Sequence, residues 1–247
     1  MLSEAQVGTS GFAYREWVGS VYPRGATTSQ LLPLYAQRLP AVEIATTYTR
    51  TPTAEQVTAW AASVPPGFEF CLKAPNRVGL ELGLKGARAL GAFLEVVEPL
   101  EDHLGPLLVQ VPESMKADRR ALSLFLDQVP QELRLAFDLQ HASWHDEATL
   151  RLLSAHEAAM VLTDNGEGAP RLQVTAAFTY VRIRRDDDRS DAAIDEWAER
   201  LSLLARRGID VHAFLKHDRR GRSVDRAMRL ASLLRSGSEV GEQAMLS

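Results

Sequence analysis

Residues 106–140 read PLLVQVPESMKADRRALSLFLDQVPQELRLAFDLQ, and this stretch indicates the class of fold. Its two ends, residues 106–111 and 133–140, are short apolar runs with turn-forming or charged residues on either side, which is typical of β-strands. Residues 118–129, between them, place apolar side chains at the 3.6-residue spacing of a helix. A strand, a helix and a second strand in this order predict a βαβ unit.

The same alternation continues through the rest of the chain. Eight apolar runs are predicted as strands, and nearly every one ends in a charged or amide-bearing residue. Most are separated by enough residues for a helix, so the sequence predicts an α/β protein with a single (β/α)₈ TIM-type barrel, a fold that typically takes about 250 residues. The predicted strands are residues 5–10, 41–46, 68–73, 106–111, 133–140, 158–164, 178–184 and 210–216.

One connection departs from this regular alternation. Residues 165–177, between the sixth and seventh strands, contain Gly166, Gly168 and Pro170. Glycine and proline at this density interrupt helices. We therefore expect an irregular barrel, with a missing or reduced helix at this point.

The length and composition predict one globular domain. The chain has 247 residues, of which 45% are hydrophobic and 24% are charged, as in ordinary globular proteins. No linker, low-complexity tract or internal repeat divides it. A single domain is expected over residues 1–247, with a core over 5–235 and a flexible tail over 236–247.

Cysteine content and hydropathy bear on the compartment. Cys71 is the only cysteine, so no intramolecular disulfide can form. The N-terminus lacks a basic segment followed by a long apolar run, and no apolar stretch reaches about 18 residues. We expect a cytoplasmic protein without membrane association, and the net charge of −4 argues against general attraction to nucleic acid.

Seven polar side chains fall at strand ends that would face the barrel mouth. Side chains two residues apart lie on the same side of a strand, and the carboxyl ends of TIM-barrel strands form the active-site face. The alternative is a plug of salt bridges, because a buried charge is costly unless it is paired. If these sides point inward, the mouth carries Glu43, Lys73, Gln110, Asp138, Asp164, Arg182 and Lys216.

The fifth and sixth strands place Asp138 beside Asp164. Two adjacent carboxylates suit a divalent cation, or they split their pKa values so that one acts as an acid and the other as a base. His217, at the end of the eighth strand, is a further candidate ligand. The sequence therefore predicts catalytic roles for Asp138 and Asp164, or a divalent metal ion held by Asp138, Asp164 and His217.

Two further pairs are Glu43 with Lys73 and Arg182 with Lys216. We predict that Lys73 and Glu43 are catalytic and orient the reacting group, although a lysine beside a glutamate is more often a salt bridge. Many barrels bind a phosphate after the seventh and eighth strands. Arg182 and Lys216 are therefore predicted to anchor an anion.

Four more residues complete the predicted substrate-binding set. Gln110 and His141 fall at strand ends, and Trp144 follows in the motif HASWHDE. Tyr14 belongs to residues 8–23, a first loop with four aromatic residues within eleven positions. Aromatic rings there can stack on a sugar or a base, or they can close the end of the barrel against water.

Several motifs resemble the YecE-like family, also called domain of unknown function family 72. The stretch GTSGFAYREWVGSVYP is similar to the opening of that family, with Phe12 in place of a tryptophan. The resemblance runs from Val7 to Leu234 and implies a TIM barrel, with no established activity. The other motifs are AVEIATTYTRTP, FEFCLKAP, GPLLVQVP, LAFDLQHASWHDE and FLKHD.

The resemblance also covers most of the predicted site. Four positions depart from the family, because Ala45, Thr49, Asp138 and Gln140 stand where relatives have Asn, Tyr, Glu and Arg. Contacts that relatives make through Asn or Arg are therefore expected to differ here. The family-like positions are Glu43, Thr47, Lys73, Gln110, His141, Ser143, Trp144, Asp164, Arg182 and Lys216.

Three hypotheses for the function follow. The leading one is an enzyme, a hydrolase, lyase or isomerase, that acts on a small anionic molecule, phosphorylated or sugar-like, by acid–base or metal-assisted chemistry. A metal-dependent nucleic-acid-processing barrel, with Arg219, Arg220 and Arg222 on backbone phosphates, is the second. A non-catalytic ligand-binding or interaction protein is the third.

Overall fold

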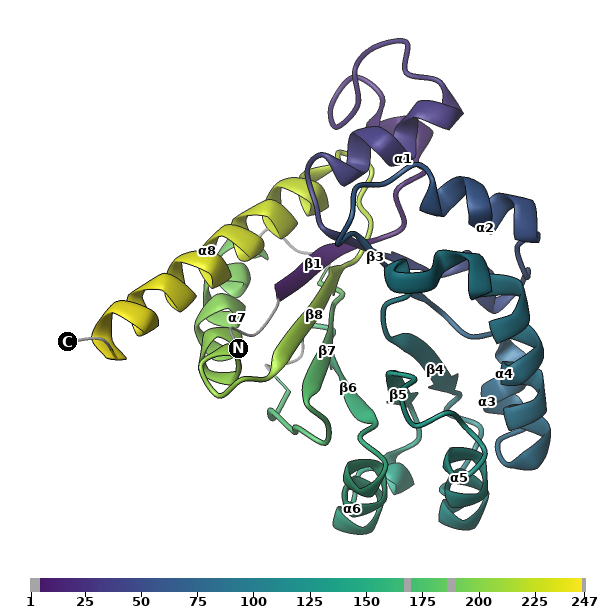
Figure 1. The fold of residues 1–247 in the computed structure, drawn as a ribbon. Helices are drawn as coiled ribbons and strands as arrows, with labels where there is room; N and C mark the ends of the chain where they lie inside the picture. The colour runs from purple at the N-terminus through teal and green to yellow at the C-terminus, as the bar shows by residue number, and fades with distance from the viewer. Residues whose placement is uncertain (1–4, 167–169, 186–189, 246–247) are drawn as a thin grey trace. The chain divides into compact units, whose positions relative to one another are not determined.

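The computed structural model describes residues 5–166, 170–185 and 190–245 (Figure 1). Its eight strands form one sheet in the order β3-β2-β1-β8-β7-β6-β5-β4, and the strands alternate with helices. This confirms the predicted α/β fold of the TIM-barrel type. The strands are β1 (Ala5–Ser10), β2 (Ala41–Ile44), β3 (Glu69–Leu72), β4 (Leu107–Val111), β5 (Leu135–Leu139), β6 (Ala159–Asp164), β7 (Phe178–Ile183) and β8 (Asp210–Leu215).

In the described residues, α-helices occupy six of the seven connections between strands, and α8 follows the last strand. Between β6 and β7 no helix occurs in the described residues, as the glycines and the proline there predicted. The α-helices are α1 (Thr28–Ala36), α2 (Ala54–Ala61), α3 (Asn76–Leu80), α4 (Leu84–Val97), α5 (Arg119–Leu126), α6 (Glu147–Ala155), α7 (Ser190–Ala205) and α8 (Arg222–Met245). Four 3₁₀-helices are η1 (Arg15–Trp17), η2 (Thr46–Tyr48), η3 (Glu98–His103) and η4 (Ala142–Trp144).

Contacts divide the chain into two compact units. Unit 1 comprises residues 1–42, 162–172 and 177–247, and unit 2 comprises residues 43–161 and 173–176. Strands β1, β7 and β8 belong to unit 1, and β3, β4 and β5 belong to unit 2. α8 continues to Met245, through most of the segment predicted as a tail.

Unit 1 is built on parallel strands β1, β8 and β7, with α7 and α8 side by side (Figure 1). Gly8 on β1 lies against the backbone of β2, because a Cβ atom added there would be 2.0 Å from the Ala41 carbonyl oxygen. The fully buried Tyr35 of α1 accepts a hydrogen bond from Thr9 N at 2.8 Å and donates one to Ala41 O at 3.0 Å. The tyrosine hydroxyl thus ties α1 to the backbone beside β1.

Unit 2 contains the βαβ stretch on which the sequence prediction was based. Asp118 caps α5 by accepting a hydrogen bond from Ala121 N at 2.9 Å, which satisfies a free amide of the first turn. Phe125 of α5 then packs edge-on against Phe137 of β5, with ring centroids 5.9 Å apart. Both rings are fully buried, so this contact attaches the helix to the sheet.

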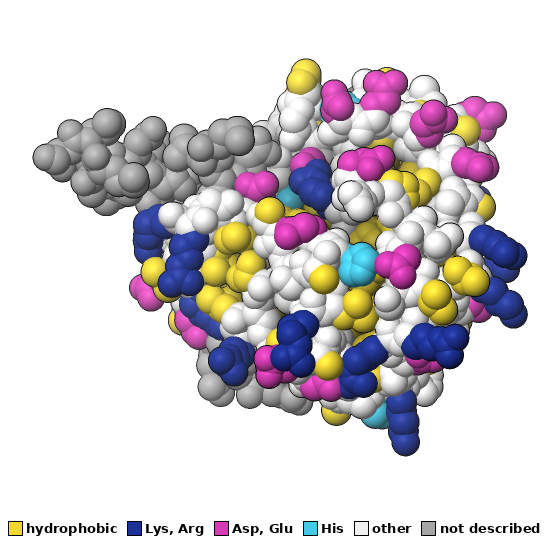
Figure 2. Space-filling view, turned by 60° about the horizontal axis from the view of Figure 1, so that its bottom comes forward, with side chains coloured by type: hydrophobic (Ala, Val, Ile, Leu, Met, Phe, Trp, Pro, Cys, Tyr) yellow, Lys and Arg dark blue, Asp and Glu magenta, His cyan; other side chains and the backbone are white. Residues whose placement is uncertain are grey.

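On the face drawn in Figure 2, Asp and Glu side chains lie mostly across the upper part, whereas Lys and Arg side chains lie mostly along the lower part, with hydrophobic side chains between them. None of the helices in the described ranges combines the length and the apolar run that crossing a bilayer requires.

The close approach at Gly8 predicts a large effect of a single methyl group. In Gly8→Ala the new Cβ meets a backbone oxygen that cannot move aside, so we expect the free energy of unfolding to fall by about 1–3 kcal/mol. Gly91→Ala is the matched control, because no atom lies within 4 Å of a Cβ there and α4 should gain about 0.5–1 kcal/mol. Urea denaturation followed by circular dichroism measures both, and equal stability of the two variants would contradict the prediction.

Candidate functional site

Within unit 2, the turn that follows β2 is hydrogen-bonded to the end of β3. Lys73, directly after β3, donates its backbone N–H to Ile44 O at 3.0 Å. The hydroxyl of Thr47 lies 2.9 Å from Ile44 O and 2.6 Å from Lys73 O, within hydrogen-bond distance of both carbonyls. The buried Thr47 therefore holds 3₁₀-helix η2 against the end of β3.

The side chain of Lys73 has a defined position at this end of the sheet. Its Nζ lies 3.6 Å from the centroid of the Tyr48 ring, in a cation–π contact. On the neighbouring strand, the Glu43 side chain is fully buried. A buried carboxylate and an oriented ammonium on adjacent strand ends are suited to acid–base chemistry, and they are equally the components of a structural ion pair.

Gln110 and Asp138 are partners in the register of β4 and β5. Each is the last residue but one of its strand, and each is partly exposed. Side chains at paired positions of neighbouring strands lie on the same face, so an amide and a carboxylate stand next to each other here. The sequence placed both residues at strand ends but did not pair them.

In the motif after β5, Trp144 is buried and has a structural role, whereas His141 is partly exposed. Trp144 is fully buried and donates a hydrogen bond from Nε1 to Met115 O at 3.0 Å, which leaves no ring face for a bound molecule. This corrects the expectation that Trp144 contacts a substrate. His141 caps η4, because its Nδ1 accepts a hydrogen bond from Ser143 N at 3.1 Å and lies 2.9 Å from Ser143 Oγ.

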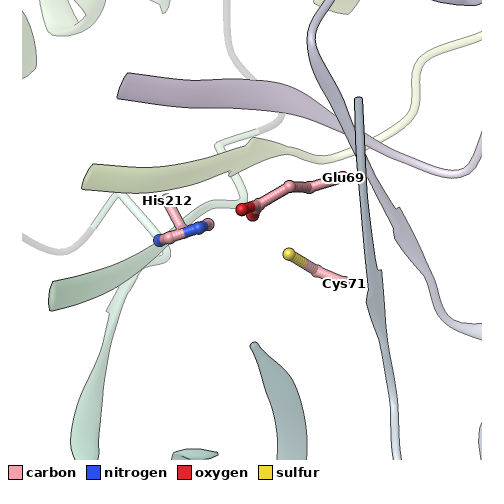
Figure 3. Close-up of side chains that lie close together, drawn as sticks. All are labelled: Glu69, Cys71 and His212. Carbon is pink, nitrogen blue, oxygen red and sulfur yellow. The ribbon is translucent and has the colours of Figure 1, made fainter. Parts of the chain in front are cut away.

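Glu69 and Cys71 project from the same face of β3 (Figure 3). Arg134 donates a hydrogen bond to Glu69 at 2.9 Å, which forms an ion pair that sequence reasoning missed. Burial raises the pKa of the Cys71 thiol well above its usual range, and the Glu69 carboxylate raises it further. The buried thiol therefore stays protonated and fills space in the interior.

In unit 1, Asp164 ends β6 and is fully buried. One carboxylate oxygen accepts hydrogen bonds from Arg185 Nε at 2.8 Å and from Trp197 Nε1 at 2.7 Å, and the other accepts one from Gly166 N at 2.9 Å. Burial acts to raise the pKa of Asp164, but the hydrogen bonds from Trp197, Arg185 and Gly166 outweigh it, so the pKa lies below its usual range.

The geometry of Asp164 also shows a structural role. Its carboxylate faces Trp197 of α7, and both of its oxygens accept hydrogen bonds. Asp164 thereby positions Arg185 and α7. The catalytic and metal-binding roles expected from the sequence stay predictions.

A hollow of about 80 Å³ lies after β7 and β8. It has an apolar side formed by Ile183, Ile194 and Leu215. Four basic side chains line it against one carboxylate, so its lining is positively charged. The polar lining residues are Arg185, Lys216, His217, Asp218, Ser223 and Arg226.

Asp218 occupies the amino-terminal end of α8. Its carboxylate accepts backbone hydrogen bonds from Arg220 at 2.8 Å, Arg222 at 3.2 Å and Ser223 at 2.6 Å. Burial acts to raise the pKa of Asp218, but the hydrogen bonds from Ser223, Arg220 and Arg222 lower it below its usual range. The carboxylate thus takes the place at a helix N-terminus where barrels commonly hold a phosphate, and a bound anion would have to be held by side chains.

The two cations predicted after the seventh and eighth strands differ in position. Arg182 is buried within β7, in register with Phe214 of β8. Lys216 comes two residues after Phe214, is partly exposed and lines the hollow. Among the described residues of the hollow, Arg185 and Arg226 are cations that the sequence did not single out. Their positions depend on distant ion-pair partners, Asp164 at the end of β6 and Asp191 in the first turn of α7.

The aromatic first loop packs against the turn between β8 and α8. Tyr14 stacks on the His217 ring with centroids 3.7 Å apart, and Trp17 donates a hydrogen bond from Nε1 to Asp218 O at 2.7 Å. The Glu16 carboxylate lies 3.0 Å from His217 Nε2. Tyr14 therefore covers His217 at the edge of the hollow, and Glu16 is a polar partner that no sequence motif singled out.

The parallel strands, the alternating helices and the charged strand ends define a TIM-type α/β barrel with its polar groups at the carboxyl ends of the strands. The chain belongs to the family described as "Protein of unknown function DUF72", whose model matches residues 6–245. This confirms the family resemblance seen in the sequence motifs.

Solved structures of the same family share the fold. A DUF72 family protein from Thermotoga maritima is 26% identical, with a TM-score of 0.80 over 94% of this chain and 99% of that one. A DUF72 family protein from Enterococcus faecalis is 19% identical, with a TM-score of 0.73 over 94% of this chain and 95% of that one. No curated protein sequence matches this chain.

The hydrogen bonds of Asp164 predict a pH-dependent contribution to stability. Because its pKa is lowered on folding, this contribution is complete above the ordinary value of 3.8 and is lost as the pH falls through the folded-state pKa. Asp164→Asn should lower the free energy of unfolding at pH 7 by about 3 kcal/mol and should flatten the loss of stability below pH 4.

Asp195→Asn is the control for this prediction. It removes an ion pair between Asp195 and Arg229 whose side chains are about half exposed, and such pairs contribute little. Urea denaturation at a series of pH values measures both variants. An Asp164→Asn protein as stable as the Asp195→Asn protein would show that the buried carboxylate has no structural role.

Proposed function

We propose that this protein is an enzyme that acts on a small anionic molecule, phosphorylated or sugar-like, which it holds in the hollow after β7 and β8. The observation that carries the proposal is the charge of the lining, in which the three cations Arg185, Lys216 and Arg226 stand against a single carboxylate. That carboxylate, Asp218, accepts the backbone amides at the start of α8, which hold it at the helix terminus. An anion entering the hollow therefore meets an excess of positive charge.

The arginines of the hollow are held in place by acidic partners outside its lining. Arg185 donates a hydrogen bond from Nε to Asp164 at 2.8 Å, and Arg226 donates one from Nε to Asp191 at 2.8 Å. A guanidinium that is fixed through Nε can present its terminal nitrogens to phosphate or carboxylate oxygens. The size of the hollow supports a single phosphate or carboxylate group, since a water molecule takes about 30 Å³ of liquid.

For unit 2, taken by itself, we propose that Lys73 and Glu43 supply acid–base chemistry to a molecule bound at the ends of β2 and β3. The cation–π contact with Tyr48 holds the ammonium of Lys73 in one position, as a proton-transferring group requires. Gln110 and Asp138, paired in register, and the partly exposed His141 are proposed as polar contacts to a bound molecule. A hydrolase, lyase or isomerase is compatible with these groups.

Anion binding predicts a selective effect of two substitutions. Lys216→Met and Arg226→Met should each weaken binding of inorganic phosphate about tenfold, because each removes a charge-assisted hydrogen bond. Arg229→Met is the control, since Arg229 lies on the same helix, one turn further on, and pairs with Asp195 outside the hollow. Isothermal titration calorimetry at constant ionic strength measures the three affinities.

Two outcomes of this titration would contradict the proposal. Phosphate binding that is unchanged in Lys216→Met and Arg226→Met would remove the hollow as the anion site. Tighter binding of DNA or RNA oligonucleotides, lost when Arg219, Arg220 and Arg222 are replaced by Met, would favour the nucleic-acid alternative, because these three residues are exposed.

The acid–base roles predict a loss of turnover without a loss of phosphate affinity. Lys73→Met and Glu43→Gln should lower turnover of phosphorylated sugars, followed by nuclear magnetic resonance, by about 10²- to 10⁴-fold. Lys85→Met, at an exposed position of α4, should leave turnover unchanged. Full turnover in Lys73→Met would assign Lys73 and Glu43 to a structural ion pair.

A further inference from the structure

A glutamate and a histidine from distant parts of the sequence pair at the edge of the hollow. His217 Nε2 lies 3.0 Å from Glu16 Oε1, and both residues belong to unit 1. The His217 side chain lines the hollow and is 25% exposed. Its other ring nitrogen, Nδ1, makes no hydrogen bond to another residue within the described ranges.

The imidazole is held in a fixed plane by its aromatic neighbours. Tyr14 stacks on it with an interplanar angle of 26° and a centroid distance of 3.7 Å, and the Trp17 ring lies 5.6 Å away. Both aromatic residues are themselves anchored, because Tyr14 donates a hydrogen bond to Ser10 O at 2.6 Å and Trp17 donates one to Asp218 O at 2.7 Å. The stacking and the contact with Glu16 together define the orientation of the His217 imidazole.

The Glu16 contact also defines which nitrogen carries the hydrogen. A carboxylate only accepts hydrogen bonds, so a neutral imidazole that bonds to Glu16 through Nε2 must carry its hydrogen on Nε2. Nδ1 is then left with a lone pair. We infer that His217 is a base, oriented by Glu16, which takes a proton through Nδ1 from the anionic molecule bound in the hollow; this rests on the proposed function.

The charges around the ring support proton transfer in this direction. When the proton moves from a C–H or O–H group of the bound molecule to Nδ1, the electron pair stays on that molecule. Glu16 balances the new imidazolium charge, and the cations Lys216 and Arg226, which line the same hollow, would stabilise the negative charge that develops on the molecule. Return of the proton to the molecule restores the neutral ring. Glu16 is in this scheme a positioning residue.

The orientation of the ring is tested by nuclear magnetic resonance of the full chain labelled with ¹⁵N-histidine, at pH 8. The His217 signal, identified by its loss in His217→Gln, should show the hydrogen on Nε2. In Glu16→Gln this preference should be lost, because an amide can also donate. A hydrogen on Nδ1 in the unaltered protein would overturn the inference.

The role of His217 as the base is tested by deuterium exchange from D₂O into dihydroxyacetone phosphate. This probe has a phosphate group and acidic C–H groups. Exchange should fall about 100-fold or more in His217→Gln and about tenfold in Glu16→Gln. His145→Gln, in unit 2, should leave it unchanged.

Binding of the same probe, measured by its ³¹P signal, separates the two possible failures. A probe that binds to the unaltered protein without any exchange would overturn the role of His217 and leave the anion site standing. A probe that does not bind would refute the anion site, and the inference that rests on it would fail for that reason.

Discussion

Burying the Asp164 carboxylate is the constraint on which the polar end of unit 1 depends. A charged group without solvent contact needs partners, and Asp164 takes them from the loop after β7, from α7 and from its own turn. These hydrogen bonds place Arg185 at the edge of the hollow and attach α7 to the end of β6 through Trp197. One carboxylate therefore determines both a helix position and the orientation of a cation.

The need of acidic groups for hydrogen-bond partners also explains why the hollow is lined by side chains and not by free backbone amides. Asp218 accepts the amides at the start of α8, so the helix terminus is already satisfied. Arg226 is held by Asp191 from the first turn of α7. The acidic groups act as internal partners that orient the cations, and the positive charge remains on the lining of the hollow.

The strands could be predicted from the sequence because each is a continuous apolar run. β1 has the predicted bounds, residues 5–10, and β7 ends one residue before its predicted end. The missing helix after β6 follows from local glycine and proline content. Each of these features depends on residues that are close together in the sequence, and such local patterns can be recognised without a structure.

The candidate site could be predicted only in part. Alternation shows which side chains share a face of a strand, but not which face points to the helices, and so it does not predict the contact of Asp164 with Trp197. Glu16 and His217 are separated by 201 positions, and no local pattern connects them. Trp144 was chosen for its aromatic ring, whereas a partner 29 residues earlier, Met115, keeps it buried.

The charge of the hollow is tested most directly by anomalous diffraction from crystals of the protein grown with selenate. The account predicts a selenium peak between Lys216 and Arg226, within hydrogen-bond distance of both side chains. Selenate bound elsewhere on the protein, with none in the hollow, would contradict it.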